Sequence, residues 1–147
     1  MPELFDENSD AYKFAHEHFE LQKAMHYIGA TLTGIAPGWA EITCPYSENL
    51  TQQNGYFHAG MVVSLADTAG GYAAATYMDP TTNILAVEFK VNFMNPAKGD
   101  PIIARGKVLK AGRTLAVCTV EVFSVEDGNE KLAALMQQTL MYLHKKA

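Results

Sequence analysis

The chain has 147 residues, of which 48% are hydrophobic and 18% charged, a composition typical of one soluble globular domain with a full core. Its formal net charge of -5 argues against nucleic acid as the main partner, because binding to phosphates requires a basic surface. It lacks the apolar run of about 18 or more residues that spans a membrane, and its acidic N-terminus has no apolar secretory core. We therefore expect a single cytoplasmic domain over residues 1–147, in which Cys44 and Cys118 are buried free thiols.

The first part of the chain predicts a helix and a β-hairpin. Residues 9–25 are typical of a helix with apolar surface, although the apolar stripe is not regular. Strand-like segments follow around 28–36 and from Trp39 to Pro45, where apolar and polar residues alternate. The turn residues Pro37-Gly38 lie between these segments, which favours a hairpin.

A long central helix is predicted over residues 59–78. It ends before Asp79-Pro80, because the residue before a proline is disfavoured in helical geometry. The segment is rich in alanine and glycine, and it includes the adjacent pair Gly70 and Gly71. A glycine inside a helix costs about 1 kcal/mol relative to alanine, so the pair indicates that another backbone approaches closely, from a wrapped sheet or a twin helix.

Strand patterns dominate the rest of the chain. Antiparallel strands are predicted at 84–94, 102–110 and 114–125, separated by turn residues. In the first strand, one face is expected to carry Leu85, Val87, Phe89, Val91 and Phe93. Residues 132–143 fit a helix as well as a strand, and periodicity alone does not decide between them. This order of elements predicts an α+β fold, in which an antiparallel sheet wraps around one long helix.

Asp67 is the one carboxylate of the predicted central helix. Burying a carboxylate among small apolar residues is costly unless it has a partner or a function. Asp67 lies eight positions after Ala59, which is about 12 Å along a helix axis. Its side chain and the backbone N–H of Ala59 therefore cannot reach one substrate atom within a single chain. If both groups are catalytic, the site combines two chains.

Two segments of the chain resemble the hotdog-fold thioesterases of the phenylacetate-pathway (PaaI-type) branch. His58-Ala59-Gly60 followed by Asp67 is similar to the histidine, two small residues, helix and acidic residue of that family. Val87 to Ala97 resembles its central strand with a Pro-Ala ending, and Gly112-Arg113 opens the next strand as in the family. The resemblance covers roughly residues 26–143, and it implies that the ambiguous last segment is a strand.

The resemblance implies an acyl-CoA thioesterase with site residues at matching positions. Ala59 stands where the N–H at the helix N-terminus binds the thioester oxygen as negative charge develops on it. Gln52 matches the amide residue that contacts the thioester or the attacking water. Asp67 matches the carboxylate that acts as general base or as nucleophile. His58 and Gly60 complete the motif, and we expect His58 mainly to hold the turn before the helix.

The same resemblance implies a homodimer with two composite sites, paired into a homotetramer. It implies no metal and no cofactor, since coenzyme A is part of the substrate, and it makes Arg113 a candidate contact for the coenzyme A phosphates. The hydroxyl that positions water in relatives has no counterpart, because Ala86 and Gly71 occupy its two family positions. Ser64 and Thr68 are weaker candidates for that role.

Two other functions stay open from the sequence. One is a hotdog protein that binds acyl-CoA without hydrolysing it, although a pure binder does not need Asp67 beside the thioester. The other is a hotdog enoyl-CoA hydratase or dehydratase, which places a histidine and an acid in a different motif. The sequence does not assign the acyl group.

Overall fold

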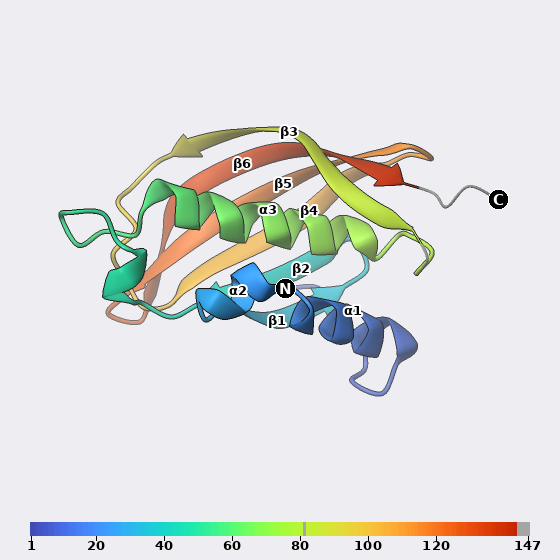
Figure 1. The fold of residues 1–147 in the computed structure, drawn as a ribbon, viewed down its shortest axis with the longest axis horizontal. Coiled ribbons are helices and arrows are strands. Elements are labelled where there is room, and N and C mark those ends of the chain that lie inside the picture. Colours follow the sequence, from blue (N-terminus) through green and yellow to red (C-terminus); the bar gives the residue numbers. More distant parts are fainter. Residues whose placement is uncertain (81, 144–147) are drawn as a thin grey trace.

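The computed structural model describes residues 1–80 and 82–143 and shows a six-stranded antiparallel sheet curved around one long helix (Figure 1). The strand order across the sheet is β1-β2-β4-β5-β6-β3. The strands are β1 (Thr31–Ala36), β2 (Trp39–Cys44), β3 (Asn83–Phe93), β4 (Ile102–Ala111), β5 (Leu115–Glu126) and β6 (Asn129–Leu143). The helices are α1 (Asp10–Glu20), α2 (Lys23–Tyr27) and α3 (Ala59–Ala75), with a 3-10 turn η1 (Glu48–Leu50). The predicted α+β fold is confirmed, and none of the described helices is long and apolar enough to cross a membrane.

The N-terminal segment forms two helices where the sequence predicts one over 9–25. The break falls at Leu21 and Gln22, because the backbone of Gln22 leaves helical geometry. The side-chain amide of Gln22 donates a hydrogen bond to the Tyr72 hydroxyl of α3 at 3.3 Å. This tertiary contact outweighs the local helical preference. Figure 1 shows α1 and α2 beside the β1–β2 end of the sheet.

The turns that join the strands follow the sequence. Pro37-Gly38 connects β1 to β2, and Asp127-Gly128 connects β5 to β6 with both residues at positive φ, as a two-residue hairpin requires. Residues 132–143 belong to β6, so the strand implied by the family resemblance is confirmed. The central helix ends three residues earlier than predicted, because the N–H groups of Tyr77 and Met78 donate to carbonyls three residues back, at Ala74 and Ala75, instead of four.

The helix α3 and the sheet approach so closely that two glycines are needed where they meet. A side chain at Gly106 of β4 would collide with the backbone carbonyl of Ala69. A side chain at Gly70 would collide with the side-chain amide of Gln138 on β6. The predicted close approach of another backbone to the central helix is therefore confirmed at Gly70, and the approaching backbone belongs to the sheet. Gly71 differs from its neighbour, since no described residue beyond its own helical turn lies within 4 Å of the position of its missing Cβ.

Strand β3 forms one edge of the sheet. The prediction that its apolar residues from Leu85 to Phe93 share one face is wrong. A bulge between Ala86 and Glu88 shifts the alternation of side chains. Before the bulge, the positions that pair with buried residues of β6 are Ile84 and Ala86; after it, they are Phe89, Val91 and Phe93. Leu85 and Phe93 are still 54% and 51% exposed, which makes this edge a surface that another strand can cover.

The two adjacent glycines of α3 are expected to respond oppositely to alanine. Gly70→Ala forces a methyl group against Gln138 and should lower the free energy of unfolding by about 1–3 kcal/mol. Gly71→Ala adds its methyl group to open space and should raise that free energy by up to about 1 kcal/mol. Urea denaturation of both variants at one protein concentration checks the pair. Equal losses in the two variants would contradict the open space beside Gly71.

Candidate active site

Asp67 lies midway along α3, with its side chain half-buried at the rim of a cavity. One carboxylate oxygen, Oδ1, accepts a hydrogen bond from Nε2 of Gln138 at 3.0 Å. Burial raises the pKa of Asp67 above its ordinary value, and the hydrogen bond from Gln138 opposes that rise. A carboxylate that is partly desolvated but held by a neutral donor is a stronger base than one in water, which suits proton abstraction.

Gln138 is the hydrogen-bond partner of Asp67 that the sequence interpretation missed. It is fully buried on β6, and its Oε1 has no hydrogen-bond partner among the described residues. Its Nε2 lies 3.4 Å from the backbone carbonyl of Asp67 as well as 3.0 Å from the carboxylate. The signal was present in the strand pattern, because Gln138 is the polar residue on a face otherwise occupied by buried Met136 and Leu140. A buried polar residue in an apolar row usually has a specific partner.

The N-terminus of α3 presents a backbone donor. His58 is the N-cap, and its Nδ1 accepts a hydrogen bond from the Gly60 N–H at 2.9 Å. That bond engages Gly60 and gives His58 a structural role in the turn. The N–H of Ala59 has no acceptor among the described residues, and Ala59 is exposed. Of the two small residues, Ala59 is therefore the one with an N–H available to a substrate oxygen.

Gln52 and Ala59 line the same cavity of about 400 Å³, here called the Gln52 pocket. Phe93 at the end of β3 and Met94 directly after the strand form another wall of it. The Gln52 side-chain oxygen accepts a hydrogen bond from the backbone N–H of Asn54, which fixes the amide within its loop. The structure thus brings the Gln52 amide to the same pocket as the Ala59 N–H, which is the predicted oxyanion donor.

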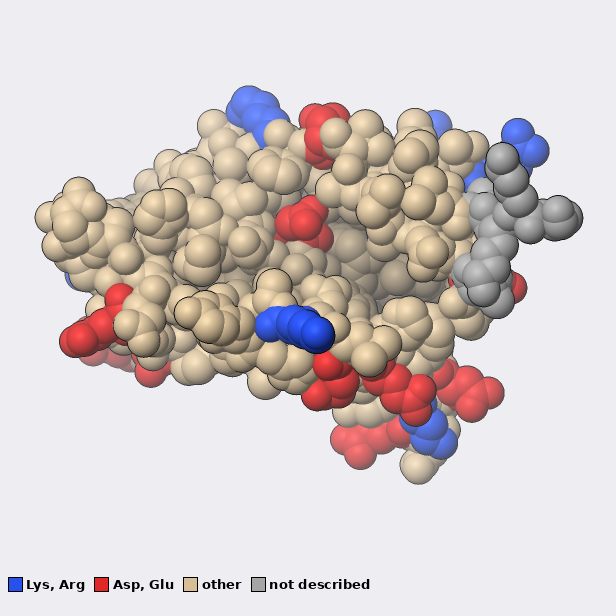
Figure 2. Space-filling model, in the orientation of Figure 1, with Lys and Arg blue, Asp and Glu red and all other residues tan. Residues whose placement is uncertain are grey.

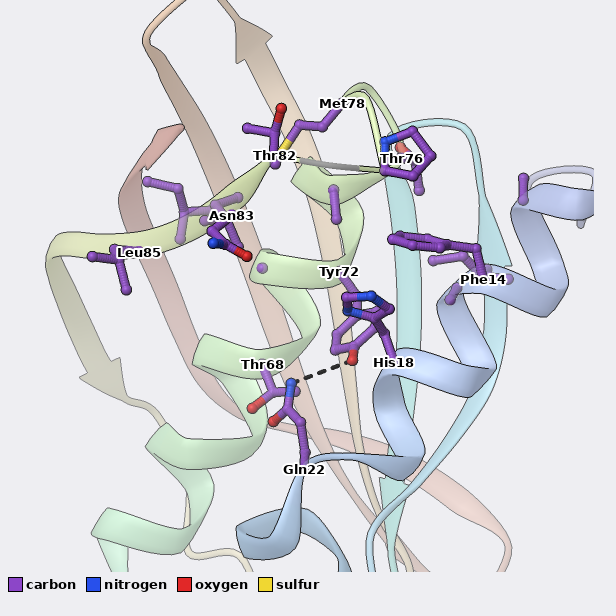
Figure 3. Close-up of a pocket in the computed structure, with 18 of the residues that line it drawn as sticks. Phe14, His18, Gln22, Thr68, Tyr72, Thr76, Met78, Thr82, Asn83 and Leu85 are labelled. Carbon is purple, nitrogen blue, oxygen red and sulfur yellow. Dashed lines mark hydrogen bonds between the residues drawn. The ribbon is translucent and has the colours of Figure 1, made fainter. Parts of the chain in front are cut away.

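Asp67 lines a different cavity of about 710 Å³, here called the Asp67 pocket. It lies between α1, α3 and the start of β3, with Thr68 and Tyr72 on its α3 side (Figure 3). Neither Ala59 nor Gln52 lines it, and Asp67 does not line the Gln52 pocket. Within one chain the predicted catalytic groups are therefore split into two separate pockets.

The remaining candidates lie in less specific surroundings. Ala86 and Gly71, which stand at the two family positions of the water-positioning hydroxyl, both line the Asp67 pocket. The pocket therefore has no hydroxyl group at either position. The hydroxyls of Ser64 and Thr68 donate to backbone carbonyls one turn earlier, each at 2.8 Å, and keep only acceptor capacity. Arg113 is exposed in the turn between β4 and β5 and lines neither pocket.

The cysteines offer no nucleophile. Cys44 and Cys118 are buried free thiols, and burial raises the pKa of each to about 11. Both are thus protonated at neutral pH, which makes them inert. Among the described residues, no group of three or more His, Cys, Asp or Glu side chains could hold a metal ion.

Comparison with known proteins identifies the family. Residues 54–131 match the family model described as the thioesterase superfamily. A thioesterase family protein from Silicibacter pomeroyi is similar at 42% identity and a TM-score of 0.88, over 90% of this chain and 98% of that chain. A 1,4-dihydroxy-2-naphthoyl-CoA hydrolase from Listeria monocytogenes is 24% identical over 119 residues, 81% of this chain and 94% of its own. The E. coli PaaI protein shares the fold, with 23% identity and a TM-score of 0.82 over 91% of this chain and 94% of that chain. The chain belongs to the thioesterase superfamily, adopts the hotdog fold, and is a thioester hydrolase.

Proposed function

We propose that the chain hydrolyses acyl-CoA thioesters to a free carboxylic acid and coenzyme A, at two composite sites of a homodimer. The observation that carries this proposal is the separation of Asp67 from Ala59 and Gln52 into two pockets of one chain. A carboxylate in one pocket and an oxyanion donor in the other perform one reaction only if a second chain brings them together. Arg113 stays the candidate contact for the coenzyme A phosphates.

Strand β3 supplies the geometry for that second chain. Its first residues, Asn83 to Ala86, border the Asp67 pocket, and its last residue, Phe93, borders the Gln52 pocket. Two identical edge strands that pair antiparallel place the start of one beside the end of the other. Such pairing joins the Asp67 pocket of each chain to the Gln52 pocket of its partner, and it also covers the exposed apolar edge.

The joined pockets supply the groups for hydrolysis. The thioester oxygen accepts a hydrogen bond from the Ala59 N–H of one chain, which stabilises the negative charge of the tetrahedral intermediate. Asp67 of the other chain takes a proton from water, whose oxygen bonds to the thioester carbon. Collapse of the intermediate breaks the carbon–sulfur bond, and the proton held by Asp67 passes to the sulfur, which leaves as the free thiol of coenzyme A. Direct attack by Asp67 through a mixed anhydride uses the same groups.

Three readouts separate this proposal from its alternatives. Release of free thiol from acyl-CoA supports the hydrolase. Binding of acyl-CoA without thiol release supports the non-hydrolytic protein, and a change in enoyl absorbance supports the hydratase. Light scattering tests the homodimer and the predicted homotetramer, and cell fractionation tests the predicted cytoplasmic location.

Complementation between two inactive chains tests the composite site. Asp67→Asn should lower kcat about a hundredfold or more, because it removes the base while keeping the shape of the side chain. Ala59→Pro should cost a similar factor of about a hundred, because it removes the oxyanion donor at the first helical position, where proline is well tolerated. A heterodimer of the two variants has one intact site and should recover about half of the wild-type activity.

Ala59→Ser is the matched control for Ala59→Pro, since it keeps the backbone N–H and should retain activity. Circular dichroism and light scattering of each variant show whether fold and assembly are intact. The heterodimer is isolated through a different affinity tag on each chain. If it is no more active than either parent variant, the site is not shared between chains.

Removal of the Gln138 donor should shift the pH dependence of hydrolysis. Asp67 must be ionised to act as base, so activity falls as the pH drops through its pKa. Gln138→Met removes the hydrogen bond that favours the ionised form, so the pKa of Asp67 rises and the acid limb of kcat/KM moves to higher pH. Gln137→Met, on the exposed face of β6, is the control and should leave the limb in place. An unchanged limb in Gln138→Met would show that Gln138 does not tune Asp67.

A further inference from the structure

We propose that α1 is the selective wall of the acyl-binding site, and that the Asp67 pocket admits uncharged acyl groups and rejects those ending in a carboxylate. This inference rests on the proposed function, because it assigns the acyl part of the substrate to one of the two pockets. The helix α1 lies before the matched family region, which begins at residue 54.

The Asp67 pocket is the larger of the two, and α1 closes one of its sides. Phe14 and His18 project from α1 into the space, opposite Thr68 and Tyr72 of α3, with Asn83 of β3 on a third side (Figure 3). Its volume of about 710 Å³ is that of a site for a small organic group. Since Asp67 lies at this pocket, a thioester held beside Asp67 has room for its acyl chain there.

Contacts with α3, and contacts between its own side chains, hold α1 in place at the side of the pocket. Phe19 is 2% exposed and packs edge-on against Tyr72, with ring centroids 5.6 Å apart. The Tyr72 hydroxyl accepts the hydrogen bond from Gln22, and the rings of Phe14 and His18 lie 4.2 Å apart. These contacts hold the lining side chains in place before any ligand binds, which is what discrimination by shape and charge requires.

The charge of the pocket opposes an acidic acyl end. Its described lining includes two carboxylates, Asp67 and Asp10, and no lysine or arginine. Figure 2 shows further acidic side chains over the α1 end of this face, with fewer basic ones among them, while the surface over α3 and β3 carries few charges. A carboxylate carried into this pocket would lose water without gaining a cationic partner, and it would be repelled by both aspartates.

The size of the pocket and its lining therefore favour neutral acyl groups. The coenzyme A half of the substrate carries the phosphates, so the same repulsion keeps it outside this pocket and directs it to the Gln52 side of the joined site. Ala11 is exposed on α1 and lines the pocket, which makes it a position where a charge can be added without disturbing the core.

The test compares octanoyl-CoA with suberoyl-CoA, which have equal chain length and differ in the terminal carboxylate. Thiol release is measured at about pH 8, so that histidine side chains are mainly neutral. Wild type should prefer octanoyl-CoA in kcat/KM. Ala11→Lys should shift the preference toward suberoyl-CoA about fivefold or more, and Asp10→Asn should shift it in the same direction by less. Glu17→Gln makes the same change of charge as Asp10→Asn at an exposed α1 position outside the pocket, and it should leave the preference unchanged.

Binding of the non-hydrolysable thioether analogues of both substrates, measured by calorimetry, keeps the inference independent of turnover. If wild type releases no thiol from any acyl-CoA, the proposed function fails, and the ratio of the two affinities across the same variants still decides the role of α1. If hydrolysis occurs but Ala11→Lys changes both substrates equally, or wild type accepts suberoyl-CoA as well as octanoyl-CoA, the α1 inference is overturned and the hydrolase proposal stands.

Discussion

The close contact between α3 and the concave face of the sheet is the constraint on which the rest of the molecule depends. Gly106 allows the backbone of β4 to meet the carbonyl of Ala69, and Gly70 leaves room for the amide of Gln138. Any larger residue at either place would push the helix away from the sheet. The helix would then carry Asp67 away from its hydrogen-bond donor, so the packing of two glycines and the state of the carboxylate are coupled.

That coupling explains how an acidic residue is kept on an apolar helix. Burial of Asp67 disfavours its charge, and the neutral amide of Gln138 compensates for part of this cost without supplying an opposite charge. A lysine or arginine in place of Gln138 would bind the carboxylate more strongly and make it a poorer base. The unpartnered Oε1 of Gln138 is a cost that the fold accepts to hold this donor.

The sequence predicted the elements whose signals are local. The central helix and the α+β order follow from turn residues and alternation, whereas the pairing of Ala59 with Gln52 at one pocket was implied by the resemblance to the thioesterase family. The break at Gln22 and the bulge after Ala86 were not predictable, because each depends on residues far away in the chain: Tyr72 in one case and the register with β6 in the other. Gln138 was visible as a polar residue in an apolar row, but its partner emerges only when β6 is placed against α3.

The bulge of β3 interrupts the exposed edge of the sheet, which limits how another strand can pair along it. An uninterrupted apolar edge of this length would accept almost any extended segment, including those of unfolded proteins. The irregularity between Ala86 and Glu88 divides the edge into two short stretches and twists one relative to the other. A straight foreign strand can follow only one stretch at a time, whereas a second copy of β3 carries the same irregularity in its own backbone. In the homodimer proposed above, the shape of the edge would therefore add to the selectivity of β3 for a second copy of itself.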